Sequence, residues 1–447
     1  MTDVTAAPAA GRPRASLTAP DARLQARRRA ETRFRLYGVA AIVVSLAVLA
    51  VMLVTILVDG VSGFRQAYVT FPVALSADQL DESGNRDRAE MAKVTTIGYA
   101  RVLDAAFVAH LRASGIEVAS EDEAAGMISR EAPAQLRDRV LADPSLVGTT
   151  VEVRALAGGR VDGYLKGRVT RETAERDGNV SPAQLDLADQ LRAAGILSTG
   201  WNGAFLTEPD ASDQRPEAAG LGVAIIGSAY MMLLTALMAL PIGVAASIYL
   251  EEFAPKNRLT DFIEVNIANL AAVPSIVFGI LGLAIFINVA GLPQSSPLVG
   301  ALVLTLMTLP TIIIATRAAL RAVPPSIRDA ALGLGASRMQ AVFHHVLPLA
   351  MPGVLTGTIL GLATALGETA PLLLIGMVAF VDNYPSAPPE GFLDPATALP
   401  VQVYSWASRA DPAFVERSAA AIIVLLLFLL VMNIVAILLR RRFERRW

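Results

Sequence analysis

Long apolar stretches separated by polar connections make up most of the second half of the chain, and one more lies near its beginning. Leu36–Val58 has no charged residue and is long enough to cross a bilayer core of about 30 Å at about 1.5 Å per residue. Other stretches of similar length and character are Gly222–Leu250, Asn269–Ala290, Leu298–Leu320 and Ser418–Leu439. A further one, Met351–Phe380, is apolar except for Glu368. The pattern predicts an all-α polytopic membrane protein with six transmembrane helices.

Residues 59–217, between the first two predicted spans, form the only sizeable polar region. Leu103, Phe107 and Leu111 make one apolar stripe of a helix, and Thr149–Ala157 has the alternation of a strand. We therefore expect a small inserted α/β or α+β domain. Its acidic and basic residues interleave, which is typical of a solvated surface. His110 lies next to the apolar stripe, and we interpret it as a packed or surface histidine.

The balance of residue types excludes an ordinary soluble domain, because 54% of the residues are hydrophobic and only 17% are charged. Arginines cluster next to the first and last spans, which by the positive-inside rule predicts that both termini are cytoplasmic. These arginines are Arg23, Arg27, Arg28, Arg29, Arg33 and Arg35 before the first span, and Arg440, Arg441, Arg442, Arg445 and Arg446 after the last. An even number of spans agrees with this. Residues 59–217 are then extracytoplasmic, and residues 251–266 and 317–346 are cytoplasmic.

This expected membrane topology divides the chain into several parts. It comprises a basic cytoplasmic tail (1–35), a first transmembrane helix (36–58), an extracytoplasmic accessory domain (59–217), a transmembrane core (218–439) with a cytoplasmic loop (322–348), and a second basic tail (440–447). The first apolar run is extended and has no small-residue cleavage site, so it is interpreted as a signal anchor.

The sequence offers no candidate for catalysis. There are no cysteines, which excludes disulfides, thiol catalysis and cysteine metal sites. A Ser/His/Asp set, an HExxH motif and a GxxxxGK[ST] loop are also absent from the sequence. We therefore expect neither an enzyme, nor a metal site, nor ATP binding by this chain itself.

Residues 326–348 form a structured polar element between two apolar stretches. Ser326 with Asp329 has the spacing of a capping box, and Ser337 with Gln340 repeats it. Gly335, between them, can adopt the left-handed conformation that ends one helix and starts a turn. The expected product is a helix, a glycine corner and a second helix. The alternative is a solvated connector.

The same segment carries a family resemblance. Asp329, Ala330, Ala331, Gly335 and the final Leu347 and Pro348 resemble the cytoplasmic coupling loop of ABC importer permeases. The resemblance implies that the short helix docks in a groove of an ATPase subunit. Asp329 stands where Glu is usual and keeps the charge. His345 stands where Ile or Val is usual, which leaves the packing of the second helix open.

Four further motifs resemble the PstA family, the permeases of the phosphate ABC transporter, over about residues 220–447. These motifs are Tyr249–Arg258, Asn269–Gly279, Gly367–Pro371 and Thr397–Gln402. The resemblance implies the type I ABC importer permease fold and import of inorganic phosphate across the bacterial cytoplasmic (inner) membrane by alternating access. It also implies several partners: a homologous PstC-type permease, a PstB-type ATPase dimer that binds ATP and Mg, and an extracytoplasmic PstS-type phosphate-binding protein.

Glu368 is the only acidic residue well inside a predicted span, and a charge there is costly unless it is paired or faces water. A carboxylate repels phosphate, so we expect Glu368 to orient a cation or gate the path, unless it only joins helices by a hydrogen bond. Many members of the family carry an arginine where this chain has Thr364. The cation then comes from the partner permease, or from Arg317 or Arg321, which could equally be membrane anchors. Pro274 and Pro310 interrupt two spans where a pathway could run. The candidate pathway set is Glu368, Thr369, Thr364, Arg317, Arg321, Pro274 and Ser275.

Two other functions remain as alternatives. One is a permease for another oxyanion such as sulfate or molybdate, against which the Asn269–Gly279 and Gly367–Pro371 motifs argue. The other is a membrane-anchored sensor whose outer domain binds a ligand. A sensor does not need an ATPase-docking helix, so the loop at 326–348 argues against it.

Overall fold

The structure is a computed structural model that describes residues 22–81, 83–118, 120–176, 178–377 and 380–443. It divides into two units, residues up to Thr55 and residues from Ile56 onward. Helix α1 (Ala22–Val61) is continuous, so the basic residues from Arg27 to Arg35 belong to the same helix as the predicted span Leu36–Val58. Most of the apolar side chains of this span are exposed. Parts of the two predicted basic tails lie outside the described residues. These parts are residues 1–21, the side chain of Arg23, and residues Arg445 and Arg446.

A three-stranded antiparallel sheet organises the region after α1. Strand β1 (Arg65–Ala74) is central, and β2 (Thr150–Leu156) and β3 (Leu197–Trp201) pair with its two edges. The predicted strand at 149–157 is therefore confirmed. Because all the strand pairing in this sheet is antiparallel, the domain is α+β and not α/β.

The helices of this domain differ greatly in length. They are α2 (Ala77–Leu80), α3 (Arg88–Met91), α4 (Thr96–Ala113), α5 (Glu121–Ala125), α6 (Ala132–Ala142), α7 (Gly159–Leu165), α8 (Arg171–Ala174), α9 (Pro182–Ala193) and α10 (Ala204–Thr207), with short 3₁₀ turns η1 (Ser62–Phe64), η2 (Pro144–Leu146) and η3 (Pro216–Ala218). The predicted stripe of α4 is confirmed, since Leu103, Phe107 and Leu111 are fully buried. Phe107 packs on Phe71 of β1 with ring centroids 4.9 Å apart. His110 is half-buried, and the described residues contain no group of side chains suited to a metal ion.

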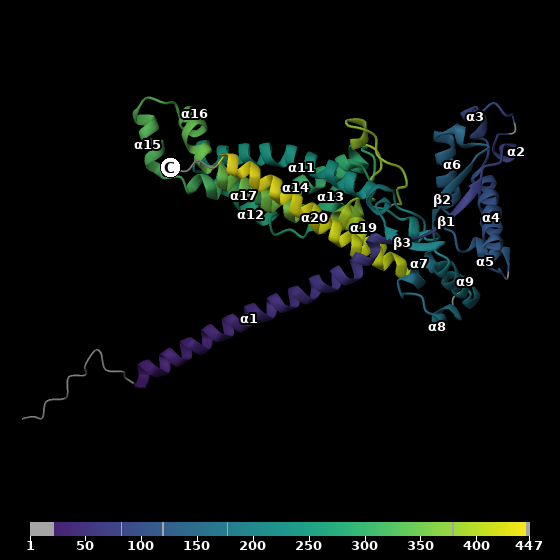
Figure 1. Ribbon diagram of the computed structural model, residues 1–447. Coiled ribbons are helices and arrows are strands. Elements are labelled where there is room, and N and C mark those ends of the chain that lie inside the picture. Colours follow the sequence, from purple (N-terminus) through teal and green to yellow (C-terminus); the bar gives the residue numbers. More distant parts are fainter. Residues whose placement is uncertain (1–21, 82, 119, 177, 378–379, 444–447) are drawn as a thin grey trace, which may run out of the picture. The chain divides into compact units, whose positions relative to one another are not determined.

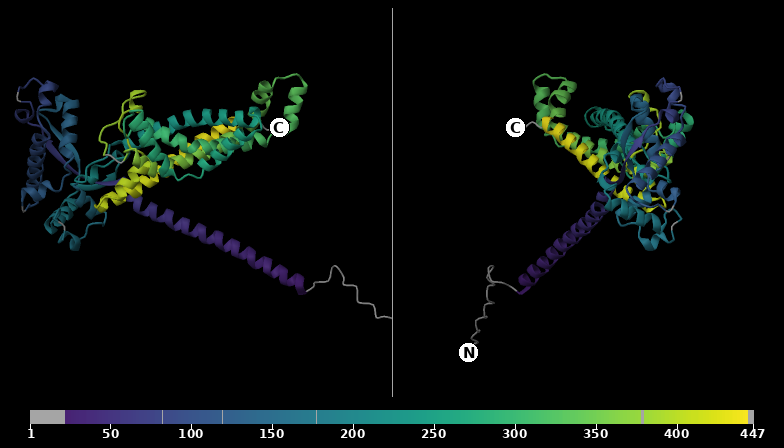
Figure 2. Two further views of the ribbon diagram at one scale, coloured as in Figure 1. Left: turned by 180° about the vertical axis from the view of Figure 1, so that it is seen from behind. Right: turned by 45° about the vertical axis from the view of Figure 1, so that its right-hand side comes forward.

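Four long helices pack side by side in the second half of the chain (Figures 1 and 2). They are α11 (Gly222–Ile248), which continues as a π-helical turn η4 (Tyr249–Phe253), α14 (Pro297–Arg321), α17 (Leu347–Leu366) and α20 (Pro412–Phe443). The remaining elements are α12 (Arg258–Leu270), α13 (Ser275–Gly282) with the π-helix η5 (Leu283–Val289), α15 (Pro325–Gly333), α16 (Arg338–Ala341) with the π-helix η6 (Val342–Val346), α18 (Ala370–Leu374), η7 (Glu390–Phe392) and α19 (Leu399–Ala407). Within this unit, α15 and α16 lie at one end of the four-helix bundle and the sheet domain at the other.

Among the described residues, five helices are long and apolar enough to cross a membrane, and a bent pair makes a sixth if it counts as one span. The bent pair corrects the predicted span Asn269–Ala290. Helix α12 ends at Leu270, and α13 leaves it at an angle of 102°. Pro274 is the reason, because proline disfavours helical conformation in the residue before it and has no amide hydrogen to donate.

The predicted span Met351–Phe380 is also wrong as a single helix. Helix α17 begins earlier, at Leu347, and stops at Leu366, and the five-residue α18 follows from Ala370. Gly367 has low helix propensity, and Pro371 cannot donate a hydrogen bond to the preceding turn. Glu368 consequently lies in a break between two helices and not inside a helix.

The sheet domain and the membrane helices share a buried junction. Phe205 of α10 belongs to the same apolar cluster as Trp406 of α19 and Phe414 of α20. Trp406 also donates from its indole Nε1 to Asp210 at 2.8 Å. The chain between β3 and α11 therefore packs as part of the membrane unit as much as of the sheet domain.

Candidate functional site

The loop at residues 326–348 forms a helix, a glycine corner and a second helix, as predicted. Gly335 has φ +88°, which places it in the left-handed region. Ser337 and Gln340 make a complete capping box: the Ser337 hydroxyl accepts from the Gln340 amide at 3.2 Å, and Gln340 Oε1 accepts from the Ser337 amide at 2.9 Å. The segment is therefore structured, and most of its residues are exposed.

The predicted capping box at Ser326 and Asp329 is wrong. Helix α15 starts at Pro325 with Pro324 as its N-cap, and no side chain caps it. Pro324 and Pro325 have no amide hydrogens, so this helix start leaves fewer free donors and has less need of a cap. Ser326 is an exposed residue of the first turn, and Asp329 is exposed as well.

Apolar side chains project from the tip of this loop. Ala331 is buried, whereas Ala330 is exposed. Leu334 is 90% exposed, and Leu332, Met339 and Phe343 are 43%, 58% and 45% exposed. Such a surface is unfavourable in water and is suited to a partner groove. Sequence reasoning from the alanines and the glycine missed these four side chains, although their spacing on two short helices was available as a signal.

The second helix packs through valines and not through its histidines. Val342 and Val346 of η6 are buried, whereas His345 is exposed. His345 and His344 line a cavity of about 540 Å³ that also contacts Pro324, Ile327 and Pro348. The histidine that departs from the family pattern is therefore accommodated at a surface cavity.

Arg328 of α15 joins the loop to the membrane helices. Its Nη2 donates to Glu252 of η4 at 2.7 Å, and its Nε donates to the same carboxylate at 3.1 Å. Nη1 and Nη2 also donate to the carbonyl oxygens of Val323 and Leu320, each at 2.8 Å. The Glu252 side chain is 10% exposed, so this is a largely desolvated, charge-assisted contact.

A second ion-pair network lies at the end of α14. Arg317 donates to Glu251 of η4 at 3.2 Å and to Glu264 of α12 at 2.5 Å. Arg321 donates to the other oxygen of Glu251 at 2.8 Å. One network contains Glu252 and the other contains its neighbour Glu251, both in η4 at the end of α11. Together the two networks connect α15, α11, α12 and α14. Arg328 thus contacts η4 and the end of α14 directly, and α12 is joined to them through Arg317 and Glu264.

Sequence reasoning placed Arg317 and Arg321 in the pathway or at the membrane edge, and did not identify Glu251, Glu252, Glu264 or Arg328. The available signal was the Glu251–Glu252 pair at the end of an apolar span, since carboxylates there need nearby cations. The structure pairs both arginines with Glu251, so they are not brought to Glu368.

The two broken helices meet each other. Helix α13 packs on α18, and a Cβ atom built on Gly279 would lie 2.6 Å from Cα of Pro371, so only glycine permits this approach. The contact joins the Asn269–Gly279 and Gly367–Pro371 motifs. Pro274 and Ser275 stand at the start of α13, and Thr369 at the start of α18.

Glu368 is half-buried in the break after α17. Within the described part of the chain, no side chain forms a hydrogen bond or an ion pair with its carboxylate. Thr364 donates its hydroxyl to the carbonyl of Leu360 at 3.0 Å, one turn back in the same helix. An unpaired carboxylate at a helix break can interact with water, a cation or another subunit.

Comparison with known proteins identifies two regions. Residues 239–447 match the family model "Binding-protein-dependent transport system inner membrane component", and residues 21–175 match "Domain of unknown function (DUF3333)". A solved structure of the MetNI methionine ABC transporter aligns with 50% of this chain and 97% of its own, with 17% sequence identity and a TM-score of 0.38.

Several curated permeases are similar in sequence. The probable ABC transporter permease protein YqgI of Bacillus subtilis is 39% identical over 35% of this chain and 53% of its own length. The phosphate transport system permease protein PstA of Mycobacterium leprae is 36% identical over 35% of this chain and 51% of its own. PstA of Xylella fastidiosa (strain Temecula1) is 34% identical over 42% and 63%, respectively. The chain thus spans about half the length of the first of these relatives, and the expected resemblance to phosphate permeases is confirmed.

Proposed function

We propose that the chain is the permease subunit of an ATP-driven importer for inorganic phosphate, because residues 239–447 match the family model for binding-protein-dependent transport system inner membrane components. The chain contributes the path across the bacterial cytoplasmic membrane. It does not itself hydrolyse ATP. A separate PstB-type ATPase dimer binds ATP and Mg.

The observation that supports coupling to an ATPase is the loop from Pro325 to Val346. It has two short helices at a fixed glycine corner, exposed apolar side chains at its tip, and Arg328 joined to Glu252 at its base. A loop that only connects two spans needs none of these features. Movement of an ATPase that holds Leu334 would displace α15 and, through the two ion-pair networks, α11, α12 and α14.

This function fixes the topology. The coupling loop has to lie in the cytoplasm with the ATPase, and both termini lie on the same side in agreement with the arginine distribution. The sheet domain then lies outside, where a PstS-type binding protein delivers the ion. A homologous PstC-type permease completes the pathway alongside the broken helices α13 and α18.

Phosphate is favoured over sulfate or molybdate because the similar permeases include several named for phosphate transport. The proposed pathway residues are Glu368, Thr369, Thr364, Pro274 and Ser275, around the contact between α13 and α18. Glu368 acts on a cation or on gating and not on the anion itself, since like charges repel. Arg317 and Arg321 act in coupling, through Glu251.

The decisive experiment is uptake of radiolabelled phosphate by proteoliposomes that contain the complete complex. We expect ATP-dependent uptake that excess unlabelled phosphate abolishes and excess sulfate leaves unchanged. Competition by sulfate or molybdate equal to that by phosphate would show a different oxyanion specificity. Absence of ATP-dependent uptake of any oxyanion, together with ligand binding to the outer domain, would favour the sensor.

A further inference from the structure

The two ends of helix α18 are held very differently. At its C-terminal end, Leu372, Ile375 and Met377 are at most 1% exposed and belong to one apolar cluster with side chains of α11, α13 and α14. At its N-terminal end, Gly367 is exposed, and Glu368 is half-buried without a side-chain partner among the described residues. A segment with few buried contacts opens at lower cost than one packed in a core. Movement of α18 is therefore easiest at the break that precedes it.

Ser295, just before α14, makes the hydrogen bonds that fix the C-terminal end of α18. Its amide donates to the carbonyl of Ile375 at 3.1 Å, and its hydroxyl donates to the carbonyl of Gly376 at 2.6 Å. Its own carbonyl accepts from the amide of Ala396, before α19, at 2.9 Å. The amide, the hydroxyl and the carbonyl of Ser295 thus join three segments that are distant in the sequence.

The backbone of Ser295 is strained at this junction. Its φ is +59°, in the left-handed region that is unfavourable for residues other than glycine. Gly376, to which it is bonded, has φ +94°. Ser295 is only 7% exposed, so its hydrogen bonds are largely shielded from water. A strained residue persists where its surroundings hold it in place, and such residues are typical of functional sites.

We propose that Ser295 is a positioning residue of the transport pathway. It fixes the C-terminal end of α18, so that the movement that opens the pathway is confined to the break at residues 367–369, which contains Glu368. Ser295 itself does not contact the transported ion. The proposal rests on the proposed function of the chain as a permease, but not on the identity of the ion.

The test measures how fast a thiol next to the break reacts with a water-soluble methanethiosulfonate reagent. The chain has no cysteine, so Ala370→Cys, at the first residue of α18, introduces a single thiol. The full-length chain is purified in detergent, without phosphate or an ATPase. Ser295→Ala in this background should raise the reaction rate at least fivefold, because α18 is then held at neither end.

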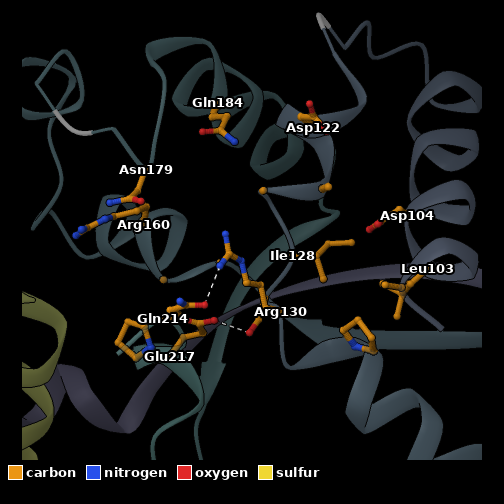
Figure 3. Close-up of a pocket in the computed structure, with 18 of the residues that line it drawn as sticks. Leu103, Asp104, Asp122, Ile128, Arg130, Arg160, Asn179, Gln184, Gln214 and Glu217 are labelled. Atoms are coloured by element: carbon orange, nitrogen blue, oxygen red, sulfur yellow. Dashed lines mark hydrogen bonds between the residues drawn. The ribbon is translucent and has the colours of Figure 1, made fainter. Parts of the chain in front are cut away.

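Two other buried serines provide the matched controls. Ser296→Ala removes the neighbouring hydroxyl, which donates locally to the carbonyl of Pro293 at 2.9 Å. Ser129→Ala removes a hydroxyl that donates to Glu217 in the sheet domain, beside the cavity of about 700 Å³ shown in Figure 3. All three alanine variants should lower the melting temperature, since each loses a buried hydrogen bond. Only Ser295→Ala should change the reaction rate of the thiol.

A second substitution keeps the proposal falsifiable if Ser295→Ala folds poorly. Ser295→Gly also lacks the hydroxyl, but glycine adopts φ +59° without strain, so this variant should fold normally. We expect the same rise in reaction rate. The proposal is overturned if Ser295→Ala and Ser295→Gly react no faster than Ser296→Ala.

The movement itself is tested in the complete complex that carries Ala370→Cys. Trapping the complex with ATP and vanadate should change the reaction rate of the thiol at least threefold relative to the nucleotide-free complex. Equal rates in the two states of a complex that imports its ion would also overturn the proposal. Absence of uptake by the wild-type complex would contradict the proposed function, whereas the thiol reaction of the purified chain would still decide whether Ser295 fixes α18.

Discussion

Arg328 and Glu252 form an ion pair between the proposed coupling loop, residues 325–346, and the membrane helices. The Arg328 side chain is 22% exposed and Glu252 10%, so loss of one charge leaves the other largely desolvated. Each single substitution therefore affects both the stability of the loop and the transmission of movement.

Glu252→Gln keeps the size of the side chain and removes its charge. We expect a loss of roughly 1–3 kcal/mol, measured as a lower melting temperature of the purified chain. We also expect more ATP hydrolysed per phosphate imported, because α15 moves without α11. Asp261→Asn, at an exposed position of α12, is the control and should change neither quantity. A Glu252→Gln complex with normal stability and normal stoichiometry would contradict the coupling role.

Substitutions of Glu368 test its proposed role in the transport pathway. Its carboxylate has no partner among the described residues. Glu368→Gln should assemble normally and reduce phosphate uptake at least tenfold, because the role proposed for Glu368 depends on its charge and not on hydrogen bonding. Glu368→Asp should be intermediate. Uptake and complex yield are measured together. Near-normal uptake by the Gln variant, with assembly failure of Glu368→Leu, would instead assign the residue a purely structural role.

At the scale of the element, the α15–α16 loop depends on one backbone conformation. Gly335 has φ +88°, and a Cβ atom there would meet no other atom within 4 Å. Any effect of substitution therefore comes from the backbone and not from steric contact with neighbours.

Gly335→Val should destabilise the corner by about 1–2 kcal/mol, because a β-branched residue is unfavourable in the left-handed region. We expect normal amounts of the subunit in the membrane, reduced affinity for the ATPase and impaired uptake. Gly335→Asn is the matched control, since asparagine tolerates this conformation, and it should retain most activity. Equal uptake by the two variants at equal abundance would show that the corner is not required.

At the scale of the whole molecule, a buried ionic cluster joins the sheet domain to α20. Arg417 of α20 is 4% exposed and donates to Gln66 of β1 at 2.9 Å and to the carbonyls of Glu217 and Ala219 at 2.7 and 2.8 Å. Its neighbour Glu416 pairs with Lys166 at 3.0 Å and with Arg168 at 2.5 Å. The sequence analysis expected residues 59–217 to be an accessory domain. Their contacts lead us to expect that deletion of this range impairs assembly.

Arg417→Met should therefore lower the stability of the whole chain by roughly 3–5 kcal/mol, because three acceptors and the nearby acids lose their cation. Thermal unfolding in detergent measures this. Arg171→Met removes an exposed pair with Asp186 and Asp189 and should leave the melting temperature unchanged. Comparable effects of the two variants would mean that the junction is no more important than a surface ion pair.

The apolar runs, the glycine at 335 and the capping box at Ser337 could be predicted from the sequence because each is determined by neighbouring residues. The apolar runs alone could not show where spans break, since Pro274 and Pro371 are tolerated within a span or interrupt it according to how α13 and α18 pack. The partners of Arg317, Arg328 and Arg417 were decided only by the tertiary structure. Ion pairs between residues distant in sequence depend on which helix ends meet, and that depends on the packing of the whole bundle.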